Sequence, residues 1–216
     1  ILYDKTKVDE EDLEAGYEIL RNPKYKGNIY MYDSVRDSFM CAFKALGYSM
    51  NTEDDQEIQD AYDWLINQKE TMDPVYVSDD GIDNMKNSEK AIAVMYSGAA
   101  AEIISENENM AFYLPNEGTN VWFDGFVITK ECKEVDLAHA FINYMCDDEH
   151  ALSNTLEVGY LTPNINAAKE AKEEEYSDNE AYAIRTDLDG LDEVFVAQSN
   201  EIKEKFSVLW TKIISK

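Results

Sequence analysis

Three neighbouring residues near the middle of the chain carry side chains that suit the binding of an organic cation. Trp122 and Phe123 supply aromatic faces, and Asp124 supplies a carboxylate directly after them. The quadrupole of an aromatic ring attracts a cation, and a carboxylate pairs with an ammonium group through charge-assisted hydrogen bonds. The competing interpretation is structural: Trp122 packs in the core, where tryptophan is highly buried on average, and Asp124 is a solvated charge at a strand end.

A second group of polar residues stands at the start of a predicted helix. Asp33 or Ser34 caps a helix that runs to Leu46, Gly47 ends it, and Asp37 lies in its first turn. Negative and hydroxyl groups at this position are explained by capping chemistry alone. The same groups could also hold a cationic ligand. The apolar stripe of this helix comprises Val35, Phe39, Ala42, Phe43 and Leu46.

A third candidate is Tyr96, at the end of a predicted strand over 91–96. Ser97 and Gly98 follow, and then a helix, and such strand–turn–helix junctions often place ligand groups at the helix N-terminus. The junction has neither the pattern of a phosphate-binding loop nor that of a nucleophile elbow. Tyr96 could equally be a core residue.

The elements around the first group are predicted from hydrophobic periodicity. β-branched and aromatic residues predict a strand over Val121–Thr129. Two amphipathic helices follow, over Lys133–Cys146 and Glu149–Val158, and then a turn over Gly159–Pro163 that contains Tyr160. The residues predicted to form the core face of the first helix are Leu137, Ala138, Phe141, Ile142 and Met145.

Elsewhere the chain alternates between predicted strands and helices, which indicates an α/β fold. A helix is predicted over Asp9–Leu20, a buried strand over Asn28–Tyr32 and a helix over Gln56–Asn67. Gly190–Ser215 is predicted to be helical, with Trp210 as a packing residue.

The charge balance excludes several classes of function. The chain has 45 acidic and 19 basic residues, and its formal net charge is −26. Such a surface repels the phosphates of nucleic acids and anionic lipid headgroups, so we expect no nucleic-acid partner. It attracts cations and speeds their encounter with the protein.

No motif predicts a metal or a cofactor. The three cysteines (Cys41, Cys132 and Cys146) form no zinc-binding pattern or disulfide framework, and Cys41 and Cys146 fall on apolar helix positions that predict burial. Two acidic stretches ending at Gly81 and Gly190 fail as calcium loops, because Tyr76 and Arg185 occupy the first ligand position.

A set of short motifs, in order and at matching spacing over nearly the whole chain, resembles the spermidine/putrescine-binding proteins of bacterial polyamine ABC transporters. The motifs are Tyr25–Gly27, Asp33–Asp37, Ala45–Ser49, Val94–Gly98, Asn120–Asp124, Phe141–Met145 and Gly159–Asn164. The likeness begins after the family's first lobe, so we expect the chain to be a piece of a longer receptor.

The resemblance implies roles for seven residues. In the family, a pair of carboxylates at the helix start holds a ligand ammonium group; Asp37 matches the second, Ser34 takes the place of the first, and Asp33 lies beside it. Trp122, Tyr96 and Tyr160 would enclose the methylene groups of the ligand, and Asp124 would neutralise an ammonium end. The serine leaves open which polyamine is preferred.

The resemblance also implies a periplasmic-binding-protein type II-like fold with the ligand between two lobes. Residues 1–120 with 165–216 would form the second, C-terminal lobe, and 121–164 would return to the first lobe. We expect the strand over 121–129, without its sheet neighbours, to repack or to pair or swap with another copy of the chain.

The implied function is extracytoplasmic polyamine binding, with an ABC-transporter permease as partner and without catalysis. Two alternatives stay open: the same fold binding another cationic metabolite or a peptide, and a hydrolase that uses Asp37 and Asp124 as a carboxylate pair. A minor third is an acidic surface-interaction protein.

Overall fold

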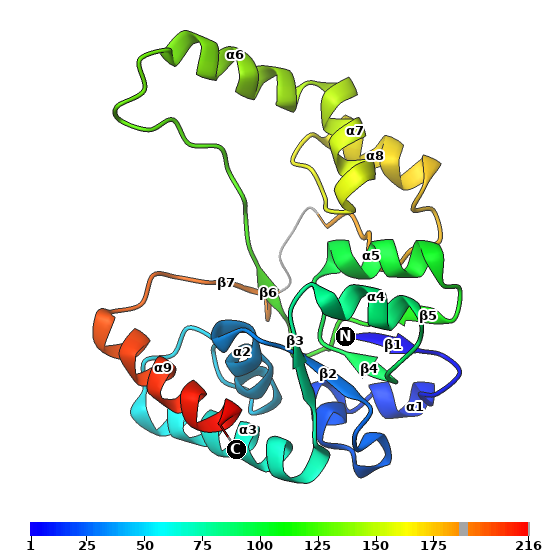
Figure 1. Ribbon diagram of the computed structural model, residues 1–216, viewed down its shortest axis with the longest axis vertical. Helices are drawn as coiled ribbons and strands as arrows, with labels where there is room; N and C mark the ends of the chain where they lie inside the picture. Colours follow the sequence, from blue (N-terminus) through cyan, green and yellow to red (C-terminus); the bar gives the residue numbers. More distant parts are fainter. Residues whose placement is uncertain (186–189, 216) are drawn as a thin grey trace.

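The computed structural model describes residues 1–185 and 190–215 of the chain. Figure 1 shows a body, built on one sheet, and an arm that extends away from it and carries helices α6 (Val135–Cys146) and α7 (Asp148–Val158). Of the two rejected calcium-loop stretches, the one that ends at Gly190 begins at Asp187 and so lies largely outside the described residues.

Within the described part of the chain, the body sheet has five strands in the order β3-β2-β4-β1-β5. Strand β2 pairs in parallel with β3 and β4, and β1 is antiparallel to β4 and β5. The strands are β1 (Leu2–Asp4), β2 (Ile29–Tyr32), β3 (Val75–Val77), β4 (Ile92–Ala93) and β5 (Met110–Phe112). All four residues of β2 are buried, as the sequence predicts.

The two faces of the sheet face two different hydrophobic clusters, because successive side chains of a strand point to opposite sides. Ile29 and Met31 belong to the first cluster, and Tyr30 and Tyr32 belong to the second. The sheet therefore carries a layer of helices on each face.

The first face is covered by the helices α1 (Glu10–Leu13), α2 (Val35–Ala45), α3 (Asp55–Met72) and α9 (Asn200–Ile214). The second face is covered by α4 (Asp80–Lys86), α5 (Ser97–Glu106) and a segment that follows α8 (Ile165–Glu174). Trp210 packs edge-to-face on Tyr76 at 5.3 Å between ring centroids, which confirms its packing role.

The predicted helix over Asp9–Leu20 is wrong in its extent. Helix α1 ends at Leu13, and two short 3₁₀ segments, Gly16–Arg21 and Pro23–Tyr25, follow. Gly16 has φ +59°, and a Cβ atom there would lie 1.9 Å from Oε1 of Glu117. The left-handed backbone and the close approach of Glu117 interrupt the helix at this glycine.

The predicted strand over Val121–Thr129 is also wrong in its extent. Only Asn120 and Val121 form a strand, β6, which pairs in parallel with β7 (Glu193–Val194). From Trp122 onward the chain leaves the body as the extended stem of the arm, where it meets no neighbouring strand (Figure 1).

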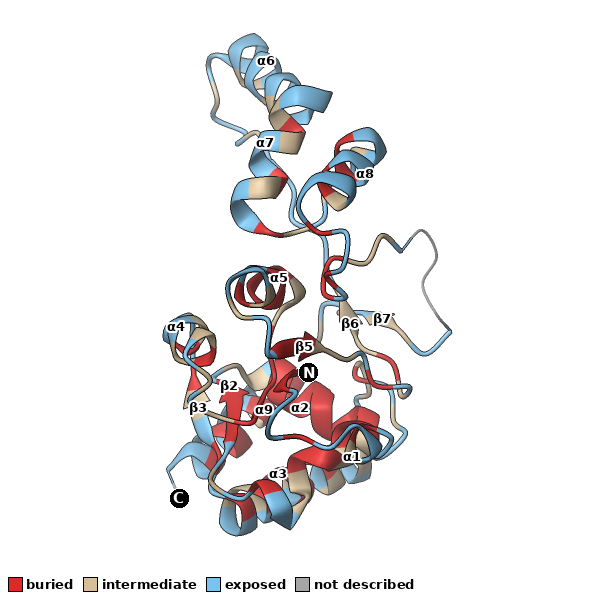
Figure 2. Cartoon of the chain, turned by 90° about the vertical axis from the view of Figure 1, so that its right-hand side faces the viewer, coloured by how far each residue is buried: buried red, intermediate tan, exposed pale blue. Residues whose placement is uncertain are grey.

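Helix α6 forms where it is predicted, but its predicted core face is wrong. None of its residues is buried: Leu137 is 68% exposed and Phe141 53%, and Ala138, Ile142 and Met145 are only half-buried. Figure 2 shows the contrast between this exposed arm and the buried interior of the body. The apolar face has formed on the helix, but no described element covers it.

The cysteines divide between these two regions. Cys41 is fully buried on α2, as predicted, and burial raises the pKa of its thiol to about 12. The predicted burial of Cys146 is wrong, because this residue ends the exposed helix α6. Among the described residues, no helix combines the length and the apolar character needed to cross a membrane.

Candidate functional site

The N-terminus of α2 brings Asp37 into a buried network of hydrogen bonds. Ser34 caps the helix, and its hydroxyl donates to Oδ2 of Asp37. The hydroxyl of Tyr96 donates to the same oxygen at 2.8 Å, and the amide of Asn120 donates to Oδ1 at 3.0 Å. The carboxylate is only 7% exposed, so these donors, from α2, the β4–α5 junction and β6, replace most of its solvation.

A row of four aromatic rings starts beside this network. Tyr32 and Tyr96 lie 4.4 Å apart between centroids, Tyr96 and Trp122 4.9 Å, and Trp122 and Tyr160 6.1 Å. The last two pairs are edge-to-face, a favourable arrangement for aromatic side chains. The structure thus brings together Tyr96, Trp122 and Tyr160, which are 26 and 38 residues apart in sequence.

Two glycines allow Tyr160 to reach this row. Gly159 ends α7 with φ +71°, and the hydroxyl of Thr155 donates to the carbonyl of Tyr160. A Cβ atom on Gly98 would lie 2.4 Å from the Tyr160 ring, and one on Gly159 would lie 2.7 Å from the carbonyl oxygen of Gly98. The arm therefore meets the N-terminus of α5 with no room for a side chain between them.

Asp124 lies on the exposed stem of the arm, two residues beyond Trp122. Its carboxylate has no hydrogen-bond or ion-pair partner among the described residues. Its charge helps to raise the pKa of Tyr160, after burial and the charge of Asp79. Asp124 is therefore electrostatically coupled to the aromatic row and still free to take a cation.

Asp33 is placed differently from the other predicted residues. Its side chain is exposed, and its backbone N–H donates to the carbonyl of Val77 at 2.9 Å. Its charge contributes to the raised pKa of Tyr76, on the first face of the sheet. No contact in the described structure joins Asp33 to Asp37.

The phenols of the row are held in their neutral form. Burial, the charge of Asp37 and the hydrogen bond to Asp37 together raise the pKa of Tyr96 well above its usual range. Burial and the charge of Asp79 do the same for Tyr32. At physiological pH these side chains are hydrogen-bond donors with apolar ring faces, which suits an aliphatic chain that carries ammonium groups.

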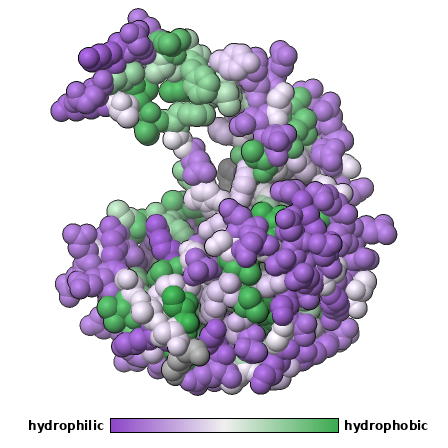
Figure 3. All heavy atoms as spheres, in the orientation of Figure 1, coloured by the Kyte–Doolittle hydropathy of each residue, from purple (hydrophilic) through white to green (hydrophobic). Residues whose placement is uncertain are grey.

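Two cavities lie near the N-terminal half of α2, and only one of them borders the predicted site residues. A small cavity of about 40 Å³ is bordered by Asp37, Tyr96, Asn120 and Tyr32. A larger one, of about 410 Å³, lies between α2 and α9 and is bordered by Arg36 and Phe195, but by none of the seven predicted residues. We place the site at the smaller cavity, because the carboxylate and the aromatic row meet there. Figure 3 shows a broad hollow between the body and the arm.

Comparison with known proteins identifies the family of the chain. The family model of bacterial extracellular solute-binding proteins matches residues 1–189. This chain belongs to that family. Residues 190–216 lie beyond the match, although α9 packs within the body.

Curated proteins resemble the chain over about three quarters of its length. The Escherichia coli spermidine/putrescine-binding periplasmic protein is 30% identical over 165 residues, which is 76% of this chain and 47% of that protein. The Pseudomonas aeruginosa putrescine/cadaverine-binding protein is 29% identical over 175 residues, 76% of this chain and 49% of that protein. The chain spans about half the length of these curated relatives.

A solved structure shares the fold. The spermidine/putrescine ABC transporter substrate-binding protein of Streptococcus pneumoniae superposes with a TM-score of 0.80 at 32% identity, over 99% of this chain and 65% of that one. The α/β, periplasmic-binding-protein-like fold expected from the sequence is thereby confirmed. These relatives are binding proteins and not enzymes, so the comparisons do not favour the hydrolase alternative. Among the described residues, no group of three or more His, Cys, Asp or Glu side chains could hold a metal ion.

Three residues contact the site without having been assigned a role there from the sequence. Asn120 binds Asp37, Tyr32 begins the aromatic row, and Gly98 makes room for Tyr160. Tyr32 could have been found, since it ends a predicted buried strand next to Asp33. Nothing in the sequence pattern marks the contacts of Asn120 or Gly98, which depend on segments far apart in the chain.

Proposed function

We propose that this chain carries half of the ligand-binding cleft of a polyamine receptor that works outside the cytoplasm. The observation that carries the proposal is the aromatic row Tyr96–Trp122–Tyr160, with a buried carboxylate, Asp37, at one end and a free one, Asp124, close to the other. The relatives whose names record spermidine, putrescine or cadaverine binding support the same ligand class.

The binding mechanism follows from the residues. Trp122, Tyr96 and Tyr160 pack against methylene groups, each of which contributes about 0.8 kcal/mol when it is buried. Asp124 pairs with an ammonium group, and Asp37 accepts a second one by exchanging an internal donor, with Ser34 beside it. A charge-assisted hydrogen bond contributes about 1.5–3 kcal/mol, so two such bonds and several methylenes suffice for micromolar affinity.

The same proposal assigns lobes and a transport partner. Residues 1–120 with 165–216 form one lobe, and 121–164 belong to the other lobe, to which the described residues contribute only this segment. Closure of the lobes over the ligand presents the loaded receptor to the permease of an ABC transporter. The names of the relatives support this role.

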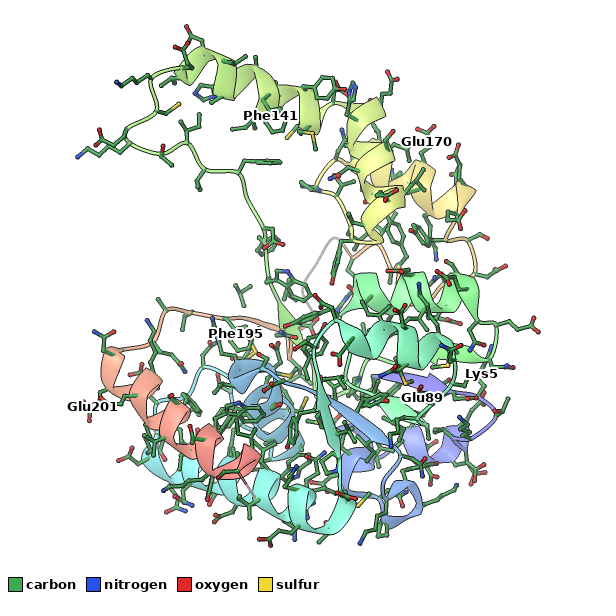
Figure 4. The ribbon with its side chains drawn as sticks, in the orientation of Figure 1. Lys5, Glu89, Phe141, Glu170, Phe195 and Glu201 are labelled. Atoms are coloured by element: carbon green, nitrogen blue, oxygen red, sulfur yellow. The ribbon has the colours of Figure 1, made fainter. Side chains whose placement is uncertain are left out.

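Isothermal titration calorimetry tests the ligand class, on this chain and on the complete receptor. We expect the receptor to bind spermidine or putrescine with micromolar affinity, and Asp124→Asn to weaken binding about ten- to a hundredfold. Glu170→Gln is the matched control, because it removes an exposed charge on α8 (Figure 4). If neither polyamine binds below millimolar concentration while another solute does, the polyamine assignment is wrong.

The second candidate is the same fold binding a different cationic metabolite. Ser34 at the place of a family carboxylate, together with the hydrogen-bonded state of Asp37, favours a ligand with one ammonium group and a neutral polar end. A monoamine that binds more tightly than putrescine in the same titration would select this candidate.

We also propose that the arm pairs or swaps with the arm of another copy when the chain stands alone. Its stem exposes Phe126 and Val127, and its helix exposes Leu137 and Phe141. Light scattering should detect concentration-dependent dimers that Phe141→Ser reduces. A monomer at every concentration, with the amides of 122–129 protected from exchange, would overturn the proposal.

A further inference from the structure

The two-stranded sheet of β6 and β7, from which the arm extends, is too short to fix its own register. Strands β6 and β7 pair only through Asn120 with Glu193 and Val121 with Val194. Even an isolated two-stranded hairpin is at best marginally stable in water, and this pair is shorter and has no connecting turn. Side-chain anchors are therefore needed to fix its register.

An ion pair between the buried Lys44 and the half-buried Glu193 provides such an anchor on β7. The ammonium group of Lys44 donates to Oε1 of Glu193 at 2.5 Å and to the carbonyl of Leu191 at 2.6 Å. Oε1 of Glu193 also accepts the backbone N–H of Met50 at 3.1 Å, and Oε2 accepts the hydroxyl of Ser49. The side chain of Lys44 is 5% exposed and that of Glu193 24%. Burial alone would raise the pKa of Glu193, but these hydrogen bonds outweigh it and hold that pKa below its usual value.

Helix α2 supplies the anchors for both strands. Asp37 binds Asn120 on β6, and Lys44 binds Glu193 on β7. The two α2 residues are seven positions apart, so they lie on one face of the helix, two turns or about 10 Å apart. Both are buried, and their charges are opposite.

The register of β6 decides where the ligand-facing aromatic ring lies. Trp122 follows Asn120 by two positions, so in an extended chain the two side chains point to the same side. Tyr96 is linked to both ends of this short segment: its ring packs on Trp122, and its hydroxyl donates to Asp37, the carboxylate that also accepts from Asn120. A slip of one residue would turn Trp122 to the opposite side.

We propose that Lys44 and Glu193 are positioning residues for the ligand site: their ion pair fixes the β6–β7 register and thereby places Trp122 against Tyr96. Replacing a buried ion pair by apolar groups often leaves stability unchanged, whereas setting a register is the best-attested use of such a pair. The inference uses the proposed function only in calling the site a ligand site.

The test needs a readout that does not depend on ligand. In the nuclear magnetic resonance spectrum of the ¹⁵N-labelled chain, the three indole N–H signals report on Trp64, Trp122 and Trp210 separately. Trp64 donates to Glu18 and Trp210 packs on Tyr76, both within the first-face layer, so they are internal references. Lys44→Met keeps the alkyl stem but removes the ammonium group, and we expect the Trp122 signal to shift or split while the other two stay in place.

Two further variants make the test specific. Glu193→Gln keeps the shape of the side chain and a neutral acceptor, and we expect a smaller change in the same Trp122 signal. Lys86→Met is the matched control, because Lys86 donates to Glu102 and Glu106 at 2.6 Å each and touches neither β6 nor β7. We expect it to leave the Trp122 signal unchanged.

The possible results separate this inference from the proposed function. We expect Lys44→Met to weaken spermidine binding about tenfold. A Trp122 signal that stays in place in folded Lys44→Met and Glu193→Gln would overturn the inference. Equal shifts of all three indoles, or unfolding of both variants while Lys86→Met stays folded, would assign the pair to general stability and also count against it. A moved Trp122 signal in a chain that binds no polyamine would support the inference and contradict the proposed function.

Discussion

Helices α2 and α6 have the same kind of sequence pattern, but the apolar face of α2 is buried and that of α6 is exposed. Both are amphipathic and of similar length, 11 and 12 residues. On α2, Phe39 and Phe43 are each 1% exposed, whereas Phe141 on α6 is 53% exposed and meets Phe126 of the stem edge-to-face (Figure 4). Periodicity identifies which face of a helix is apolar, but it does not say whether anything covers that face.

The largest expected difference between the two helices is in the free energy of unfolding. Phe39→Ala removes a ring that contacts Phe43 and Phe206, at 5.9 and 4.7 Å between centroids. We expect this variant to lose about 3–5 kcal/mol, the usual cost of such a cavity in a core. At dilutions where the chain is monomeric, Phe141→Ala on α6 should change stability by less than about 0.5 kcal/mol, as at other surface positions. Urea unfolding of both variants checks this, and comparable losses would mean that the arm folds against a cover in solution.

A smaller difference is expected at two glycines, one in the body and one in the arm. Gly98→Ala places a Cβ atom 2.4 Å from the Tyr160 ring, so we expect a loss of about 1–3 kcal/mol from overpacking, or a displaced Tyr160 and weaker polyamine binding. Gly125 in the stem has no atom within 4 Å of the position of a Cβ, so Gly125→Ala is its control. Thermal unfolding and calorimetry measure both effects. If Gly98→Ala behaves like Gly125→Ala, the contact between the arm and α5 does not persist in solution.

The smallest expected effect is a dependence on pH. The pKa of Glu193 in the folded protein lies below its ordinary value of 4.5. Its contribution to stability is therefore complete above pH 4.5 and is lost as the pH falls through the folded-state pKa. We expect urea midpoints to fall in this acid range, and to fall less steeply in Glu193→Gln.

Asp147, on the arm, is the control for this pH effect. Hydrogen bonds from the backbone and ring of His150 lower the pKa of Asp147, but this carboxylate is exposed at the start of α7. Asp147→Asn should leave the pH dependence almost unchanged. Equal slopes for wild type and Glu193→Gln would show that the Lys44–Glu193 pair does not contribute to the acid sensitivity of folding.

Local signals in the sequence predict the body well. The buried strand ending at Tyr32, the helix capped by Ser34 and the packing role of Trp210 all depend on patterns within a few residues. The extent of the helix after Asp9 could not be predicted, because Gly16, which prevents it from continuing to Leu20, meets Glu117 about a hundred residues away. Burial of α6 could not be predicted either, since it depends on what lies against the helix and not on its own sequence.

The candidate site, too, could be predicted only in part from the sequence. Aromatic and acidic residues at family positions identify Tyr96, Trp122, Asp124, Tyr160 and Asp37, and the structure gathers the three rings into one row. The state of each carboxylate could not be predicted: Asp37 is enclosed by three donors and Asp124 has no partner among the described residues. The hydrogen-bonding state of each carboxylate depends on partners from distant segments of the chain, and these partners cannot be deduced from sequence spacing.

Tyr32 belongs at once to the cluster beneath the second face of the sheet and to the row of rings above it. Substitutions in the interior under this tyrosine would therefore tilt its ring and move Tyr96, which packs on it. Under the proposed function, changes of specificity need not begin at the surface of the cleft. Such changes can also arise from substitutions in the sheet, at positions that do not contact the ligand.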